Sequence, residues 1–103
     1  MFQADKRYIT CGVQQRLPPH LIAMLWLCID LRLQSKEKLD YLQVFKFEKI
    51  SNEVLAIRHE QEKPARLYVH YTGYKDEYAG FLNETVFVID DKDHSTMLFG
   101  YEY

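Results

Sequence analysis

The spacing of hydrophobic residues alternates along the chain between a helical period and the two-residue period of strands. Between residue 19 and residue 34 or 36 the apolar positions follow helical spacing, and Pro18 and Pro19 mark the start of this helix. Segments rich in aromatic and β-branched residues predict strands at 6–13, 41–50, 54–61, 67–72, 85–90 and 95–101. Short polar turns between 50 and 54 and between 90 and 95 predict two hairpins.

These elements predict a single α+β domain over residues 1–103, in which one main helix packs on a mostly antiparallel sheet of five or six strands. A chain of 103 residues has room for one domain, and 48% hydrophobic residues can form its core. Within 41–50, Leu42 and Val44 share one face of the strand, while Phe45 and Phe47 share the other. Either a bulge near Val44 switches the faces, or the helix covers one face and a partner covers the other.

The predicted helix has two apolar stripes. The first has the width of a core-facing arc and should pack on the sheet; it consists of Ile22, Leu25, Trp26, Ile29 and Leu33. Asp30 and Arg32 separate it from a second stripe, which consists of Met24, Leu27 and Leu31. Either the polar segment 73–83 covers this second stripe, or two copies of the chain bury it in an isologous homodimer, and we favour the dimer.

The start of the chain and its cysteines indicate neither secretion nor a membrane protein. Asp5, Lys6 and Arg7 are not followed by the apolar stretch of a signal peptide, and the longest apolar run, 21–29, is well below the roughly 20 residues that cross a bilayer. Cys11 and Cys28 have neither CxxC spacing nor further ligands for zinc. We therefore expect a cytoplasmic protein with no membrane segment and two reduced, buried thiols.

No motif in the sequence indicates catalysis. The four histidines form no metal-binding pair, the glycines stand alone, and no serine or cysteine lies in a nucleophile motif. We therefore expect no metal, no cofactor and no catalytic residue. His59 and His70 could meet across the sheet as an acid and base pair, but exposed cross-strand histidines are the simpler interpretation.

Charge and tyrosine distribution favour a protein partner over nucleic acid. A net charge of -2 is too small for a general polyanion binder. Residues 69–103 carry seven acids against two lysines, and six of the eight tyrosines follow residue 67. Tyrosine gives contact area at low entropic cost, so this part of the chain predicts a surface for a basic protein. The predicted contact residues are Tyr74, Asp76, Glu77, Tyr78, Asp90, Asp91 and Asp93. The alternative is that the tyrosines cap the edges of a small sheet while the acids keep the protein soluble.

Short motifs spread over nearly the whole chain resemble a known family. They include Arg7-Tyr8-Ile9-Thr10, Leu25-Trp26, Asp40-Tyr41-Leu42-Gln43-Val44-Phe45 and Val86-Phe87-Val88-Ile89-Asp90-Asp91. The family consists of short uncharacterised proteins, a domain of unknown function, from Gram-positive bacteria, their phages and mobile elements. Lys92 stands where the resemblance leads us to expect a glycine. The resemblance implies a mobile-element setting and no assigned activity or cofactor.

Three hypotheses for the function follow. The leading one is a non-enzymatic protein-binding module of phage or mobile-element type, an inhibitor of a host defence nuclease such as a CRISPR effector. The second is a single-stranded nucleic-acid-binding accessory protein that stacks bases on Tyr8, Tyr41 and Tyr68 and holds phosphates with Lys46 and Arg58. The third is a small hydrolase or isomerase that uses His59 or His70.

Overall fold

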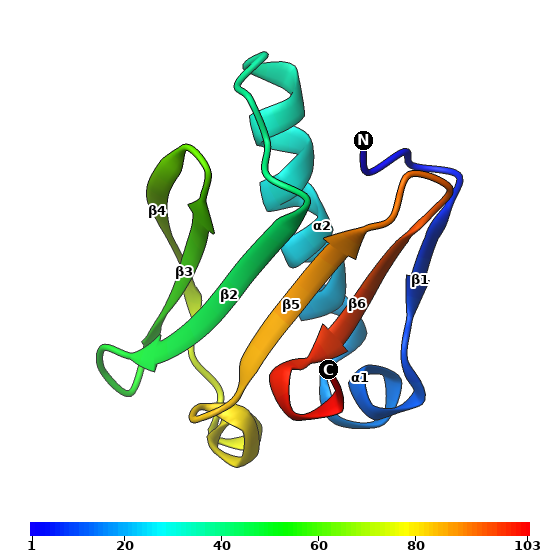
Figure 1. Ribbon diagram of the computed structural model, residues 1–103. Helices are drawn as coiled ribbons and strands as arrows, with labels where there is room; N and C mark the ends of the chain where they lie inside the picture. The colour runs from blue at the N-terminus through cyan, green and yellow to red at the C-terminus, as the bar shows by residue number, and fades with distance from the viewer.

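The chain folds into a six-stranded sheet with one long helix on one face, in a computed structural model that describes residues 1–103 (Figure 1). The strands are β1 (Arg7–Ile9), β2 (Leu42–Lys49), β3 (Val54–Glu62), β4 (Ala65–Gly73), β5 (Thr85–Asp90) and β6 (Ser95–Phe99). The helices are α1 (Cys11–Arg16) and α2 (Pro19–Gln34), with the 3-10 turns η1 (Asp76–Phe81) and η2 (Gly100–Glu102). The strand order is β1-β6-β5-β2-β3-β4, and only β1 and β6 pair in parallel. The predicted α+β class, with one main helix on a mostly antiparallel sheet, is confirmed.

Helix α2 supplies the second layer of the core. Its buried residues are Leu21, Leu25, Cys28 and Ile29, which face the buried side of the sheet. The core-facing arc is therefore rotated from the predicted stripe, because Ile22, Trp26 and Leu33 are only partly buried at its flank. The helix begins at Pro19, a favourable first residue, because the amide hydrogen that proline lacks would have no acceptor within the helix at this position. No helix of the chain has the length and apolarity needed to cross a bilayer.

The second apolar stripe of α2 stays largely uncovered. The side chain of Leu27 is 53% exposed and that of Leu31 is 37% exposed, whereas Met24 is partly buried against the core. The segment 73–83 covers only the start of the helix, where the Tyr78 hydroxyl hydrogen-bonds the His20 ring. The alternative in which this segment covers the whole stripe is therefore wrong.

Strand β2 has a regular register, so the predicted bulge at Val44 is absent. Leu42 through Lys46 pair with β5 without interruption, and Val44 through Lys49 pair with β3 in the same way. Phe45 and Phe47 are buried on the side of α2, and Leu42 and Val44 lie on the opposite face. The unusual pattern of this strand thus reflects two apolar faces.

The predicted first strand, 6–13, is wrong in its second half. Strand β1 ends at Ile9, and the Thr10 hydroxyl accepts a hydrogen bond from the Val13 amide at 3.2 Å, which caps the start of α1. Cys11 therefore lies in the first turn of a helix and is exposed, contrary to the prediction of a buried thiol. Cys28 is buried, and its burial raises the pKa of the thiol to about 11.

The N-terminal segment is part of the core. The Phe2 side chain is fully buried, and its amide donates to Asp90 Oδ1 at 3.1 Å. Arg7 Nη2 donates to the Phe2 carbonyl at 2.8 Å and to Asp30 Oδ1 at 2.6 Å. The Arg7 guanidinium also lies 4.9 Å from the centre of the Trp26 ring. Arg7 thus joins the N-terminal segment to α2.

Replacement of Phe2 tests this anchoring. Phe2→Ala should lower the free energy of unfolding by about 3 kcal/mol, because it removes a fully buried aromatic side chain. Tyr41→Ala, at a side chain that is 50% exposed, is the control and should change it by less than about 1 kcal/mol. Urea unfolding measures both, and equal values for the two variants would contradict the anchoring.

Candidate functional site

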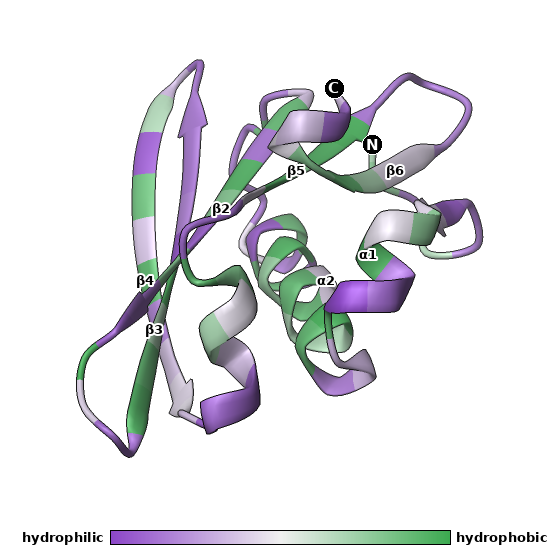
Figure 2. Ribbon diagram, turned by 90° about the horizontal axis from the view of Figure 1, so that it is seen from below, coloured by the Kyte–Doolittle hydropathy of each residue, from purple (hydrophilic) through white to green (hydrophobic).

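The sheet face opposite α2 carries an apolar patch across three strands. We call this the open face; its apolar residues are Leu42, Val44, Phe87, Ile89 and Leu98. The register aligns Leu42 with Ile89, and Val44 with Phe87 and Leu98, in adjacent cross-strand rows. All five side chains are partly exposed. Figure 2 places α2 on one side of the sheet and the C-terminal turn on the other.

A depression of about 520 Å³, which we call the trough, lies on the open face. It is lined by Leu42, Val44, Lys46, Glu62, Glu84, Thr85, Phe87, Gly100 and Tyr101. Strands β2 and β5 thus supply apolar residues, the end of β3 supplies Glu62, and η2 supplies Gly100 and Tyr101. A smaller adjoining depression of about 170 Å³ shares Leu42 and Val44 and extends to Glu60 and Gln61. The combined surface is an apolar strip with charged ends.

Most charges around the trough are paired within the chain. Glu84 Oε2 lies 2.7 Å from Arg16 Nη1. Glu60 Oε2 lies 3.6 Å from Lys46 Nζ and 3.9 Å from Arg58 Nε. Glu62 is exposed and has no ion-pair partner in the chain. Glu62 is therefore the carboxylate of the trough that is free to meet a cation from outside.

The residues predicted to bind a basic partner do not form one surface. Tyr74 and Tyr78 are buried in the core, where their rings meet edge to face with centres 5.9 Å apart. Their aromatic area serves the core, so neither can supply contact area to a partner in this fold. Asp90 is also buried, because its carboxylate holds the Phe2 amide.

The remaining four predicted acids are exposed but lie in two separate places. Asp76 and Glu77 begin η1, whereas Asp91 and Asp93 lie in the β5–β6 turn. These places are at opposite ends of β5, a strand of six residues, roughly 20 Å apart (Figure 1). Asp93 lines a depression of about 250 Å³ beside the N-terminus, together with Lys6, Lys92 and His94.

The β5–β6 turn forms although it lacks the expected glycine. Lys92 adopts a φ of 81°, in the left-handed region that favours glycine. The Asp91 amide donates to the His94 carbonyl at 3.0 Å, and the His94 amide donates to Asp91 Oδ1 at 3.1 Å. These bonds hold the turn with a non-glycine residue in it.

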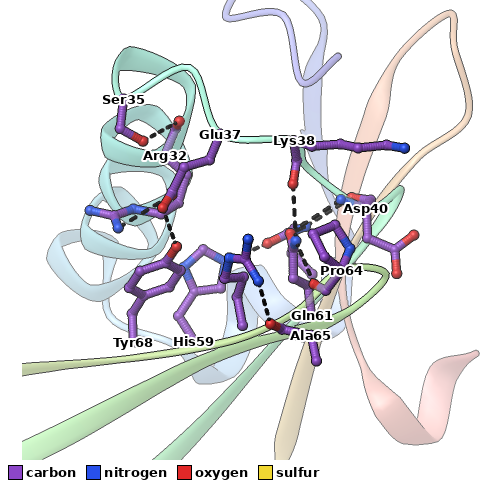
Figure 3. A network of polar contacts seen from close by, with 12 residues as sticks. Arg32, Ser35, Glu37, Lys38, Asp40, His59, Gln61, Pro64, Ala65 and Tyr68 are labelled. Atoms are coloured by element: carbon purple, nitrogen blue, oxygen red, sulfur yellow. Dashed lines mark hydrogen bonds and ion pairs between the residues drawn. The ribbon is translucent and has the colours of Figure 1, made fainter.

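A buried polar network fills the end of the core near the β3–β4 turn (Figure 3). His59, only 1% exposed, donates from Nε2 to Gln43 Oε1 at 2.6 Å, and its ring stacks on Phe45 at 4.4 Å. Gln43 Nε2 donates to Gln61 Oε1 at 2.9 Å, and Gln61 Nε2 donates to the Lys38 carbonyl at 3.0 Å. The network therefore joins β2 and β3 to the segment that follows α2.

His59 and His70 lie on the same face of adjacent strands, as the acid and base hypothesis requires. Burial, with a smaller effect of His70, lowers the pKa of His59 to about 4, and burial also lowers the pKa of His70. The prediction of an exposed His59 is wrong, because this face of β3 lies beneath α2. Neither ring lines any of the three depressions, so no substrate-sized space adjoins the pair.

Beside this pair, Tyr68 links β4 to the end of α2. The Arg32 guanidinium lies 4.0 Å from the centre of the Tyr68 ring, and the Tyr68 hydroxyl donates to Glu37 Oε1 at 2.6 Å. This hydrogen bond lowers the pKa of the Glu37 carboxyl. Tyr68 therefore does not share a face with Tyr8, Lys46 and Arg58, which the register places on the open face. No group of three or more His, Cys, Asp or Glu side chains is arranged to hold a metal ion.

Comparison with known proteins identifies the family. A family described as "Staphylococcal protein of unknown function (DUF960)" matches residues 6–102. The chain belongs to this family. A crystal structure of a protein of unknown function from Enterococcus faecalis is similar, with 28% identity and a TM-score of 0.81 over 100% of this chain and 98% of the other. No curated protein matches. The predicted resemblance to an uncharacterised Gram-positive family is thus confirmed.

The pH dependence of stability tests the buried state of His59. Its pKa falls from 6.5 to about 4 on folding, so the unfolded chain binds the proton more tightly. The stabilisation from neutral His59 is complete above pH 6.5 and is lost as the pH falls towards 4, by about 2 kcal/mol between pH 7 and pH 5. Urea unfolding of the wild type and His59→Gln measures this change.

The variant lacks the titrating ring, so the stability difference between the two proteins should shrink by that amount at pH 5. A difference that stays constant between pH 7 and pH 5 would show that His59 titrates normally in the folded state.

Proposed function

We propose that this member of DUF960 is a non-enzymatic protein-binding module that contacts its partner with the open face of the sheet. The observation that carries the proposal is the partly exposed apolar patch, which includes Val44, Phe87 and Leu98 and is bordered at Phe87 by the Tyr103 ring, 5.8 Å from it between ring centres. An antiparallel sheet with one solvated face normally carries polar residues there. An apolar patch in that position is typical of a surface that another protein covers.

The trough fits an extended segment of a partner. Apolar side chains of the segment would lie on Leu42, Val44 and Phe87, and a basic side chain would reach Glu62. A basic partner also suits the exposed acids at the two ends of β5. Their attraction acts over about 10 Å at moderate ionic strength, so it would speed the encounter and weaken as salt rises.

The positions of the two interior histidines favour binding over catalysis. His59 is held neutral by burial, and neither His59 nor His70 adjoins a depression that could admit a substrate. The trough contains Glu62, Glu84 and Lys46, and two of these are already paired within the chain, Glu84 with Arg16 and Lys46 with Glu60. What this surface offers a ligand is mainly apolar contact area, which suits binding.

The biological setting in this proposal comes from the sequence resemblance. It is a cytoplasmic protein of a phage or mobile element that inhibits a host defence nuclease, such as a CRISPR effector. The inhibitor would block the nuclease by covering a basic surface, which needs no chemistry of its own. Capture from the natural host, with mass spectrometry of the retained proteins, identifies the partner class directly.

Single-stranded nucleic acid is the second candidate ligand. Tyr8, Lys46 and Arg58 share the open face, an arrangement that suits base stacking beside phosphate contacts. Glu60 partly neutralises both cations, which favours the protein partner. Retention of single-stranded DNA on a filter at low salt, abolished by Lys46→Glu, would favour the nucleic acid instead.

A charged residue in the trough tests the proposed surface. Val44→Lys should reduce retention of the captured partner at least tenfold, because the lysine would lie in the apolar strip. Ile50→Lys is the matched control, since Ile50 is 52% exposed, lies at the other end of β2 and lines no depression. Circular dichroism checks that both variants fold. Equal retention by the two variants would remove the trough from the interface.

A further inference from the structure

Strand β4 is a long sheet edge with no protection. It pairs with β3 at nine positions, from Ala65 to Gly73, and has no strand on its other side. The amide and carbonyl groups that point away from β3 are therefore available to another strand. The other edge of the sheet, β1, has only three residues.

The devices that normally block such an edge are absent from β4. The strand contains no proline and no lysine, and its one formal charge is Arg66, next to its first residue. Leu67, Val69 and Tyr71 are 50%, 41% and 66% exposed on the open-face side. A long edge with exposed apolar side chains is a template for strand addition.

We infer that β4 pairs antiparallel with β4 of a second copy of this chain, with the two-fold axis at Val69. Val69 is the middle residue of 65–73, so this register uses all nine residues of both strands. It sets Leu67 opposite Tyr71 of the second copy and Arg66 opposite Thr72, so no like charges meet. The strand is thus complementary to itself, as an isologous interface requires.

The uncovered stripe of α2 lies on the side that this dimer would bury. Trp26 of α2 contacts Arg7 of β1, at the edge of the sheet opposite β4. At about 100° per residue, Leu31 is displaced about 140° around the helix from Trp26 and so faces the β4 side. The exposed Leu27 lies between these two directions.

Pairing of the two β4 strands would make one continuous sheet. Because the two-fold axis is perpendicular to that sheet, both copies of α2 lie on the same face, one on each side of the junction. The two apolar stripes then face each other above the paired strands. Two independent features, the open β4 edge and the uncovered stripe of α2, would therefore both be covered by a second copy of the chain.

Mass in solution is the first test. The wild type at about 100 μM should sediment at twice the 12.4 kDa of one chain, and Val69→Lys should sediment at 12.4 kDa, because two lysines would meet on the axis. A monomeric wild type overturns the inference. A Val69→Lys dimer that Leu27→Lys dissociates also overturns it, since the interface would then be α2 alone.

Engineered cysteines test the register without depending on Val69→Lys. In a Cys11→Ser background, which removes the exposed native thiol, Val69→Cys should form a disulfide-linked dimer, because facing residues have Cβ atoms about 5 Å apart. Tyr71→Cys is the matched control. Its two copies would be four positions apart, about 13 Å, and should stay unlinked. Equal crosslinking of the two variants, or none in Val69→Cys, contradicts the register.

No residue of β4 lines either depression of the open face, so a substitution can disrupt the dimer without affecting partner binding, or the reverse. A Val44→Lys protein that loses its partner should remain a dimer. If Val44→Lys dissociates the dimer as Val69→Lys does, the second copy occupies the trough and the β4 pairing is wrong.

Discussion

The packing of α2 on one face of the sheet is the contact on which the rest of the structure depends. Leu21, Leu25 and Ile29 are fully buried against strands that bring fully buried residues such as Phe45 and Val88 to the same layer. This helix covers part of one face of the sheet and leaves the opposite face and both edges without a second layer.

Other segments close the core where α2 does not reach. At the β1 side, Phe2 enters the core and Arg7 ties its carbonyl to Asp30 of the helix. At the opposite end, Gln43, His59 and Gln61 fill the interior with polar side chains that hydrogen-bond each other and loop carbonyls. Buried polar groups are tolerated there because most of them find partners, His59 Nδ1 being an exception, and burial keeps the His59 ring neutral.

The two candidate contact regions have the same origin. The trough exists because no second layer covers β2 and β5, and the β4 edge exists because the chain has no seventh strand. A small domain can thus offer a face and an edge to different partners at once. The similar structure from Enterococcus faecalis matches this chain over its whole length, so the two proteins share the complete fold. Any function common to such proteins has to use surfaces of this two-layer arrangement.

The sequence alone determined the class of fold and most of its elements. Helical periodicity and two prolines set α2, and alternation set five of the six strands nearly to their ends, because both signals are local. The apolar residues on both sides of β2 were also visible in the sequence, which left open whether a bulge or two covered faces explained them. The sequence could not reveal that Thr10 caps α1, because a short strand and a short helix have similar local patterns.

Only the tertiary structure decided which polar and aromatic residues are inside. Tyr74 and Tyr78 look like surface tyrosines in a polar segment, yet η1 turns them into the core. His59 and Gln43 are 16 residues apart in the chain, on the consecutive strands β3 and β2, and they become a buried pair because this face of the sheet lies beneath α2. Burial depends on contacts between distant segments, which no local period encodes. The sequence therefore pointed to the tyrosines and acids of residues 74–93 as the contact surface, whereas the tertiary structure points to the trough.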